Sequence, residues 1–181
     1  AGWYAESNFT TQVSGAQSPT ADATLYAKWT ANTYTLTYNY NGATGGNGTA
    51  TSSYTTGGSA ITLPTPTKTG YSFSGWYAEP GFTTSVTGTQ SPTADATLYA
   101  KWTANTYTLT YTYNGATGGN STLTSSFTSG STAVTLPTPT KTGYTFAGWY
   151  SESIFTNQVS GPQSPTADAT LHAKWTANTY T

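Results

Sequence analysis

The sequence predicts a mostly β protein, organised as a tandem array of 73-residue repeats that are joined by very short linkers. The repeats are visible directly, because Gly-Trp-Tyr occurs at 2–4, 75–77 and 148–150, always at the same spacing. The β class follows from composition. Aromatic residues make up 15% of the chain and threonine is its commonest residue, and both favour a pleated, half-buried strand.

The period divides the chain into two complete repeats, 31–103 and 104–176, which align without a gap. Residues 1–30 correspond to the C-terminal part of a repeat, and residues 177–181 correspond to the start of a further repeat. Both ends cut through a unit, as expected of a window taken from a longer array. A unit of this length can hold its own core, so each repeat is expected to fold as a small domain.

The first half of a repeat reads as a β-hairpin. In the second complete repeat, residues 105–113 alternate strictly, with Tyr107, Leu109 and Tyr111 on one face and threonines on the other. Residues 114–120 supply Asn-Gly and Gly-Gly, which favour a turn. Residues 121–130 read as the returning strand. The stretch 132–137 is then extended and ends in a proline-rich surface path.

The second half of a repeat carries the larger aromatic residues. Residues 144–150 are predicted as a strand with Tyr144 and Phe146 on one face and Trp149 on the other. The apolar cluster in 151–161 predicts a single helical or 3₁₀ turn. Residues 169–175 form the final strand.

Neighbouring repeats are separated by about three residues, "TAN" at 103–105. Flexible linkers are longer and rich in Gly and Ser. The junction is therefore expected to restrict the orientation of successive repeats, so that the array behaves as a stiff or semi-stiff rod.

The core is predicted from the large apolar side chains of these strands, because a small domain without disulfides depends on them. Tyr77 and Tyr99 are expected to be the more exposed aromatics. The predicted core residues are Trp3, Trp29, Tyr71, Phe73, Trp76, Leu98, Trp102, Tyr107, Leu109, Tyr111, Tyr144, Phe146, Trp149, Leu171 and Trp175.

Two blocks, "PTKTGYSFSGWYAE" at 66–79 and "ATLYAKWT" at 96–103, resemble the Listeria–Bacteroides repeat, the B-repeat of internalin-type bacterial surface proteins. Both complete repeats match both blocks, and residues 2–29 match the later part. The resemblance implies a compact β-grasp-like domain. It also implies a secreted or wall-attached parent protein, in which the repeats space and present other modules.

Few residues of the chain could take part in catalysis, crosslinking or metal binding. Each complete repeat has two acids and two lysines, and in the first these are Glu79, Asp95, Lys68 and Lys101. The two acids are expected to cap or form turns or to be solvated surface groups. The alternative is an intramolecular isopeptide bond, which would need a buried lysine. His172 is the only histidine. We therefore expect no catalytic residue, no cofactor, no metal site and no enzyme.

Asn8, Asn47 and Asn120 each begin an Asn-x-Thr triplet and are candidate glycosylation sites. An exposed aromatic platform for carbohydrate is a further alternative to a purely structural role of the tryptophans.

Composition also limits the partners. The chain has no arginine, five lysines and a net charge of −1, so a nucleic-acid partner is not expected. No run of about twenty apolar residues is present, so membrane insertion of this segment is not expected.

These features predict a structural segment of an extracellular or cell-surface bacterial protein. It would act as a stiff stalk or a self-assembling extracellular fibre that spaces or presents other modules. Its expected partners are neighbouring repeats and other copies of itself in a filament. The alternative is an adhesin-type module that recognises a glycan or a protein on a host or neighbouring cell.

Overall fold

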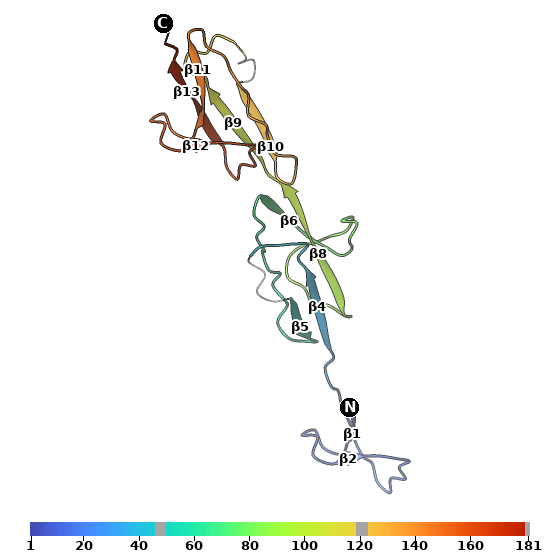
Figure 1. Cartoon of the computed structure of the whole chain (residues 1–181). Coiled ribbons are helices and arrows are strands. Elements are labelled where there is room, and N and C mark those ends of the chain that lie inside the picture. The colour runs from blue at the N-terminus through green and yellow to red at the C-terminus, as the bar shows by residue number, and fades with distance from the viewer. Residues whose placement is uncertain (46–49, 119–122, 180–181) are drawn as a thin grey trace.

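The computed structural model describes residues 1–45, 50–118 and 123–179. Over these ranges the regular structure is all β. The described residues therefore include no helix that could span a membrane. Thirteen strands form three sheets, which follow one another along the chain (Figure 1). The predicted class, a mostly β tandem array, is confirmed.

The first complete repeat forms a five-stranded sheet. Its strands are β4 (Thr33–Asn39), β5 (Thr51–Thr55), β6 (Tyr71–Tyr77), β7 (Ser85–Val86) and β8 (Ala96–Ala104). Their order across the sheet is β5-β4-β8-β6-β7. The first and last strands, β4 and β8, therefore lie side by side in the centre and run parallel, while the other pairs are antiparallel.

The second complete repeat has the same arrangement. Its strands are β9 (Thr106–Thr112), β10 (Thr124–Thr128), β11 (Tyr144–Tyr150), β12 (Gln158–Val159) and β13 (Ala169–Ala177). The sheet order is β10-β9-β13-β11-β12, with β9 and β13 parallel. The predicted hairpin is present as the antiparallel pair β9–β10, although residues 119–122 of its connection lie outside the described residues.

Residues 1–30 form a smaller sheet of β1 (Gly2–Tyr4), β2 (Gln12–Val13) and β3 (Tyr26–Lys28), in the order β2-β1-β3. These strands correspond to β6, β7 and β8 of the complete repeat, shifted by one period. Residues 1–30 thus contain no counterpart of the central strand β4 or of its hairpin partner β5.

Each complete repeat has its own core around one buried tryptophan. In the first, the ring of Trp76 lies 5.1 Å from that of Tyr38 and 5.7 Å from that of Phe73, and its Nε1 donates a hydrogen bond to the Pro64 carbonyl at 2.8 Å. Alternation along β4 delivers Leu36 and Tyr38 to this core, and threonines face water. The buried residues of the two cores are Leu36, Tyr38, Ile61, Trp76, Leu98 and Ala100, and Leu109, Tyr111, Tyr113, Trp149, Leu171 and Ala173.

The prediction that Trp149 faces away from Phe146 is wrong, and the cause is a β-bulge in β11. Simple alternation places Trp149 opposite Phe146, but the pairing of β11 with β13 shifts by one residue between Phe146 and Gly148. The extra residue turns Trp149 to the same face as Phe146, and the two rings lie 5.6 Å apart. Gly148 has φ 121°, a conformation that residues with a side chain rarely adopt.

The predicted helical turn in 151–161 is wrong. Phe155 has φ 58°, which stops a right-handed helix, and its N–H donates to the Glu152 carbonyl at 3.1 Å in a tight turn. Val159 then pairs with Trp149 in the short strand β12. Ile154, which suggested the apolar face of a helix, is 74% exposed.

Three predicted core residues are exposed. Trp3 is 55% exposed and Trp29 is 85% exposed, because residues 1–30 lack the strands that cover the equivalent tryptophans in a complete repeat. Tyr144 is 41% exposed for a different reason, which is that its position does not belong to the core. The equivalent residue of the preceding repeat, Tyr71, packs against the next repeat. Tyr71, Phe73, Trp102, Tyr107, Phe146 and Trp175 are half-buried.

Candidate functional site

The first and last strands of each complete repeat are joined directly. In the first repeat, four residue pairs form the parallel ladder, from Leu36 opposite Ala96 to Asn39 opposite Tyr99. In the second, the ladder runs from Leu109 opposite Ala169 to Thr112 opposite His172. We call this the terminal-strand ladder, because the chain enters each repeat through one of its strands and leaves through the other.

A carboxylate extends the ladder at its entry end. The Thr35 N–H donates to Asp95 Oδ1 at 2.8 Å, and the Thr108 N–H donates to Asp168 Oδ1 at the same distance. For Asp95 the sequence predicts capping, turn formation or a solvated surface role. Each aspartate binds the backbone of the first strand from the start of the last strand.

Two side chains extend the ladder at its other end. Asn41 Nδ2 donates to the Ala100 carbonyl at 2.7 Å, and Trp102 Nε1 donates to the Tyr40 carbonyl at 3.0 Å. Asn41 reaches Ala100 from a left-handed backbone conformation, φ 48°, which asparagine tolerates better than most residues. The second repeat repeats both bonds, from Asn114 Nδ2 to Ala173 and from Trp175 Nε1 to Tyr113.

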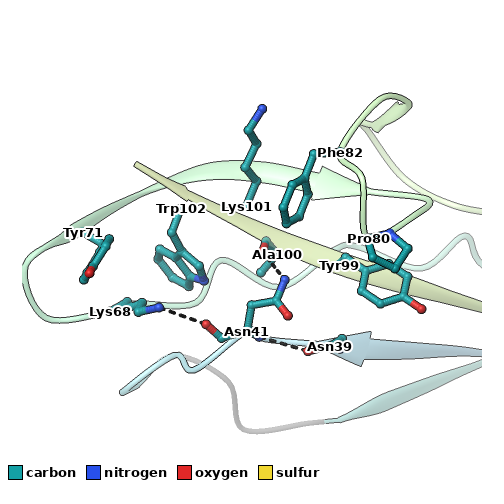
Figure 2. A pocket seen from close by; sticks show the side chains of 10 residues that line it. All are labelled: Asn39, Asn41, Lys68, Tyr71, Pro80, Phe82, Tyr99, Ala100, Lys101 and Trp102. Carbon is teal, nitrogen blue, oxygen red and sulfur yellow. Dashed lines mark hydrogen bonds between the residues drawn. The ribbon is translucent and has the colours of Figure 1, made fainter. Parts of the chain in front are cut away.

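A shallow concavity lies over this end of the ladder (Figure 2). Lys68 Nζ donates to the Asn41 carbonyl at 3.0 Å and lies 4.6 Å from the ring centroid of Tyr71. The group that Lys68 contacts is thus a backbone carbonyl, whereas an isopeptide bond needs a side-chain amide or carboxyl. The lining residues are Asn39, Asn41, Lys68, Tyr71, Pro80, Phe82, Tyr99, Ala100, Lys101 and Trp102.

All five lysines of the chain lie over aromatic rings. Lys101 Nζ is 5.0 Å from the ring of Tyr77 and 5.7 Å from that of Phe82, on the side of β8 away from Lys68 (Figure 2). An ammonium over a ring face is attracted by the ring quadrupole. The lysines therefore stabilise the repeats and do not form a basic patch.

The glutamates close the turn after the Gly-Trp-Tyr strand. Glu79 accepts hydrogen bonds from the side chains of Thr83 and Thr84 and from the Thr84 N–H, and these bonds lower its pKa. In the second repeat, hydrogen bonds from the side chain of Asn157, then from Ser151, lower the pKa of Glu152 to about 2. Each of these carboxylates thus holds together the loop that follows the Gly-Trp-Tyr strand of its repeat.

A single residue, Asn105, connects β8 of one repeat to β9 of the next. Its N–H donates to the Gly70 carbonyl at 2.9 Å, and its carbonyl accepts from the Ser129 N–H at 2.9 Å. Its side chain accepts from Ser72 Oγ at 2.7 Å and donates to the Tyr107 hydroxyl at 3.2 Å. Asn105 therefore binds both repeats through backbone and side chain.

Close packing surrounds this junction. The Tyr71 hydroxyl approaches the Ser129 carbonyl across the junction at 3.4 Å. A methyl group on Gly130 would lie 2.7 Å from the Tyr71 hydroxyl oxygen, and one on Gly70 would lie 2.6 Å from Ser129 Oγ. Both glycines therefore permit a contact between repeats that a side chain would block.

Parts of the same junction recur at the two residues equivalent to Asn105, which are Asn32 and Asn178. Asn178 makes the contacts to the preceding repeat, since its N–H donates to the Gly143 carbonyl at 2.9 Å and its Oδ1 accepts from Thr145 Oγ1 at 2.8 Å. Asn32 makes the contact to the following repeat, since its carbonyl accepts from the Thr56 N–H at 2.9 Å. The junction is thus part of the repeat unit itself. Its signal in the sequence was the recurrence of "TAN".

The remaining candidate residues are not brought together. Asn8 is exposed, and its Oδ1 accepts from the Thr10 N–H at 3.3 Å, while Asn47 and Asn120 lie outside the described residues. Tyr99 and His172 occupy equivalent half-buried places on β8 and β13. Over residues 1–45, 50–118 and 123–179 no group of three or more His, Cys, Asp or Glu side chains could hold a metal ion.

Comparison with known proteins agrees with this repeat pattern. The Listeria-Bacteroides repeat domain matches the chain three times, over residues 1–28, 34–101 and 107–174. These matches fall on the three sheets described above. No solved structure matches the chain significantly.

Relatives of the chain include proteins of two bacteria. A protein of Evansella cellulosilytica, named as a Gly-rich membrane protein, is 36% identical over 87% of this chain and 18% of its own length. Internalin H of Listeria monocytogenes is 37% identical over 62% of this chain and 20% of its own length. The chain thus spans about a fifth of these relatives. It belongs to the Listeria-Bacteroides repeat family, a repeat domain of bacterial surface and membrane-associated proteins.

Proposed function

We propose that this chain is a stiff segment of an extracellular or cell-surface stalk, which sets the distance between other modules of its parent protein. The observation that carries the proposal is the one-residue junction at Asn105, which hydrogen-bonds to the repeats on both sides. A junction of this kind leaves little freedom for one repeat to rotate against the next.

The chemistry of the chain supports a structural role over a catalytic one. The acids and lysines of the complete repeats are engaged in the ladder, in loop turns or over aromatic rings. We describe each repeat as β-grasp-like because its first and last strands pair in parallel at the centre of a mixed sheet.

A distance measurement between spin labels tests the proposal. The natural chain has no cysteine, so Thr62→Cys with Thr135→Cys places two labels at exposed, equivalent positions one repeat apart. We expect a narrow distance distribution. A distribution as broad as that of two domains on a flexible linker would refute the stiff stalk.

The junction residue provides a matched pair of variants. Asn105→Gly removes the side-chain bonds between the two labelled repeats and adds backbone freedom, so it should broaden the distribution. Asn178→Gly makes the same change outside the labelled pair and should leave the distribution unchanged. Equal widths in both variants would show that Asn105 does not hold the junction.

The adhesin alternative needs an exposed aromatic or polar surface for a glycan or protein. The large apolar side chains exposed in the described residues are Trp3, Leu25, Tyr26, Trp29, Leu123, Tyr144 and Ile154. None of these lies in the complete repeat 31–103, which favours the spacer. Glycan-array binding that Tyr99→Ala abolishes would instead support the adhesin.

We extend the proposal to assembly of copies into a fibre. The outer strands β5 (Thr51–Thr55) and β10 (Thr124–Thr128) carry Ser, Thr and one aromatic residue each, without the charges or prolines that commonly protect an edge. Light scattering of the purified chain should show association that increases with concentration. If the chain stays monomeric at every concentration, the proposal of a fibre is refuted and the proposal of a stalk is unaffected.

A further inference from the structure

We infer that each complete repeat is built to resist tension along the array, because pulling on its two ends shears the terminal-strand ladder. This goes beyond the proposed spacer function. A stiff spacer needs a rigid junction, whereas resistance to pulling depends on how the strands inside a repeat are connected.

The direction of the load follows from the parallel pairing. The chain enters the first complete repeat at Thr33, the start of β4, and leaves at Ala104, the end of β8. Since the two strands run in the same direction, these points lie at opposite ends of the ladder (Figure 1). Pulling them apart makes the strands slide along each other.

Sliding loads the ladder bonds together. The four residue pairs between Leu36 and Asn39 on one strand and Ala96 and Tyr99 on the other must yield at nearly the same moment. If the same strands were pulled apart from one end, the pairs would break one after another and each would bear the load alone.

The side-chain bonds described above lengthen the sheared region in both directions. Asp95 adds a bond before the first ladder pair, and Asn41 and Trp102 add bonds beyond the last one. The second repeat has the same set through Asp168, Asn114 and Trp175. All six bonds join the segment that enters a repeat to the segment that leaves it.

The other strands lie outside the direct path of the load. β5 pairs only with β4, and β7 pairs only with β6, so each sits at an edge of the sheet. The tension passes from β4 to β8 and then through Asn105 into β9. The tension reaches the edge strands only after the central pair has separated.

Single-molecule pulling of the full chain tests this inference by changing only the direction of the load. Cysteine handles at Thr106→Cys and Thr176→Cys attach to the start of β9 and near the end of β13, and so shear the ladder. Handles at Thr106→Cys and Thr166→Cys attach at the same end of both strands, and so peel it. All three positions are exposed.

We expect shearing to need roughly two to four times the force of peeling, because four pairs share the load in one case and break in turn in the other. Equal forces in the two geometries would overturn the inference. That result would leave the spin-label distances unaffected, so failure here is distinguishable from failure of the stalk.

A second measurement tests the contribution of the side-chain bonds, with residues 1 and 181 as the attachment points. Asp95→Ala combined with Asp168→Ala removes the entry bond in both complete repeats and should lower both unfolding forces. Asp22→Ala changes the equivalent acid in residues 1–30, which have no counterpart of β4, and should lower neither. If the double variant unfolds at the same forces as the unsubstituted chain, the aspartates do not strengthen the terminal-strand ladder against shear.

Discussion

Replacing Gly75 by alanine should destabilise the first complete repeat by about 1–3 kcal/mol. Gly75 stands at the β-bulge of β6 with φ 123°, and an added methyl group would meet only the edge of the Tyr77 ring, at 4.0 Å. Space is therefore available, and the expected loss comes from backbone strain. If the strain is relieved by removing the bulge, Trp76 turns away from Phe73 and leaves the core, which is the costlier outcome.

The assay is urea unfolding followed by tryptophan fluorescence. For a domain of this size the slope is about 1 kcal/mol per molar urea, so a loss of about 2 kcal/mol moves the midpoint of this repeat down by about 2 M. The second repeat keeps Gly148, and its transition should stay in place.

The matched control is Gly81→Ala. Gly81 does not have a positive φ, and nothing lies within 4 Å of the added methyl group, so this change should be neutral or stabilise by up to about 1 kcal/mol. If Gly75→Ala and Gly81→Ala unfold at the same urea concentration, the bulge does not require glycine and the account of the tryptophan facing is wrong.

Three further predictions use matched positions in the repeats. Trp102→Ala should lower stability by about 2–4 kcal/mol, whereas Trp29→Ala, at an exposed equivalent, should stay within about 0.5 kcal/mol; thermal unfolding checks both. Tyr71→Ala should broaden the spin-label distance distribution between the complete repeats, whereas Tyr144→Ala, at the equivalent position away from the junction between the labels, should not. The Glu152 loop should loosen in acid. Because hydrogen bonds lower the pKa of Glu152 from 4.5 to about 2, its contribution is complete above pH 4.5 and is lost as the pH falls towards 2. The amide resonance of Asn157 should follow this titration by NMR, and Glu152→Gln should abolish it.

Much of the fold could be predicted because local pattern and final structure agree. Alternation along 105–113 indicated a strand with Leu109 and Tyr111 inward, and both are buried. The 73-residue period indicated separate units, and each complete unit forms a sheet of the same order. These features depend on neighbours in sequence, which is where single-sequence reasoning is strongest.

The features that could not be predicted from the sequence depend on an irregular residue or on contacts between distant parts of the chain. The facing of Trp149 depends on one bulged residue, which a strict period of two cannot register. The parallel contact between Leu109 and Ala169 joins residues sixty positions apart, so no local pattern indicated it. The role of Asp168 follows from that contact, although an aspartate before each final strand was a signal that could have been followed.

The exposed tryptophans show how burial depends on completeness of the unit. Trp29 and Trp102 occupy equivalent places in nearly identical stretches, yet only Trp102 is covered. Its cover comes from Tyr40 and from Lys68, both earlier in the same repeat. A sequence motif alone does not therefore specify a buried side chain.

The joint at Asn105 also determines how the array grows. In the stiff stalk proposed above, Asn32 and Asn178 carry the two halves of the same set of contacts, so every step from one copy to the next should apply the same rotation and the same advance. Repetition of one fixed operation generates a screw of constant pitch. Duplication or loss of a 73-residue unit in the gene would then change the reach of the molecule in equal increments and turn its far end through a set angle each time.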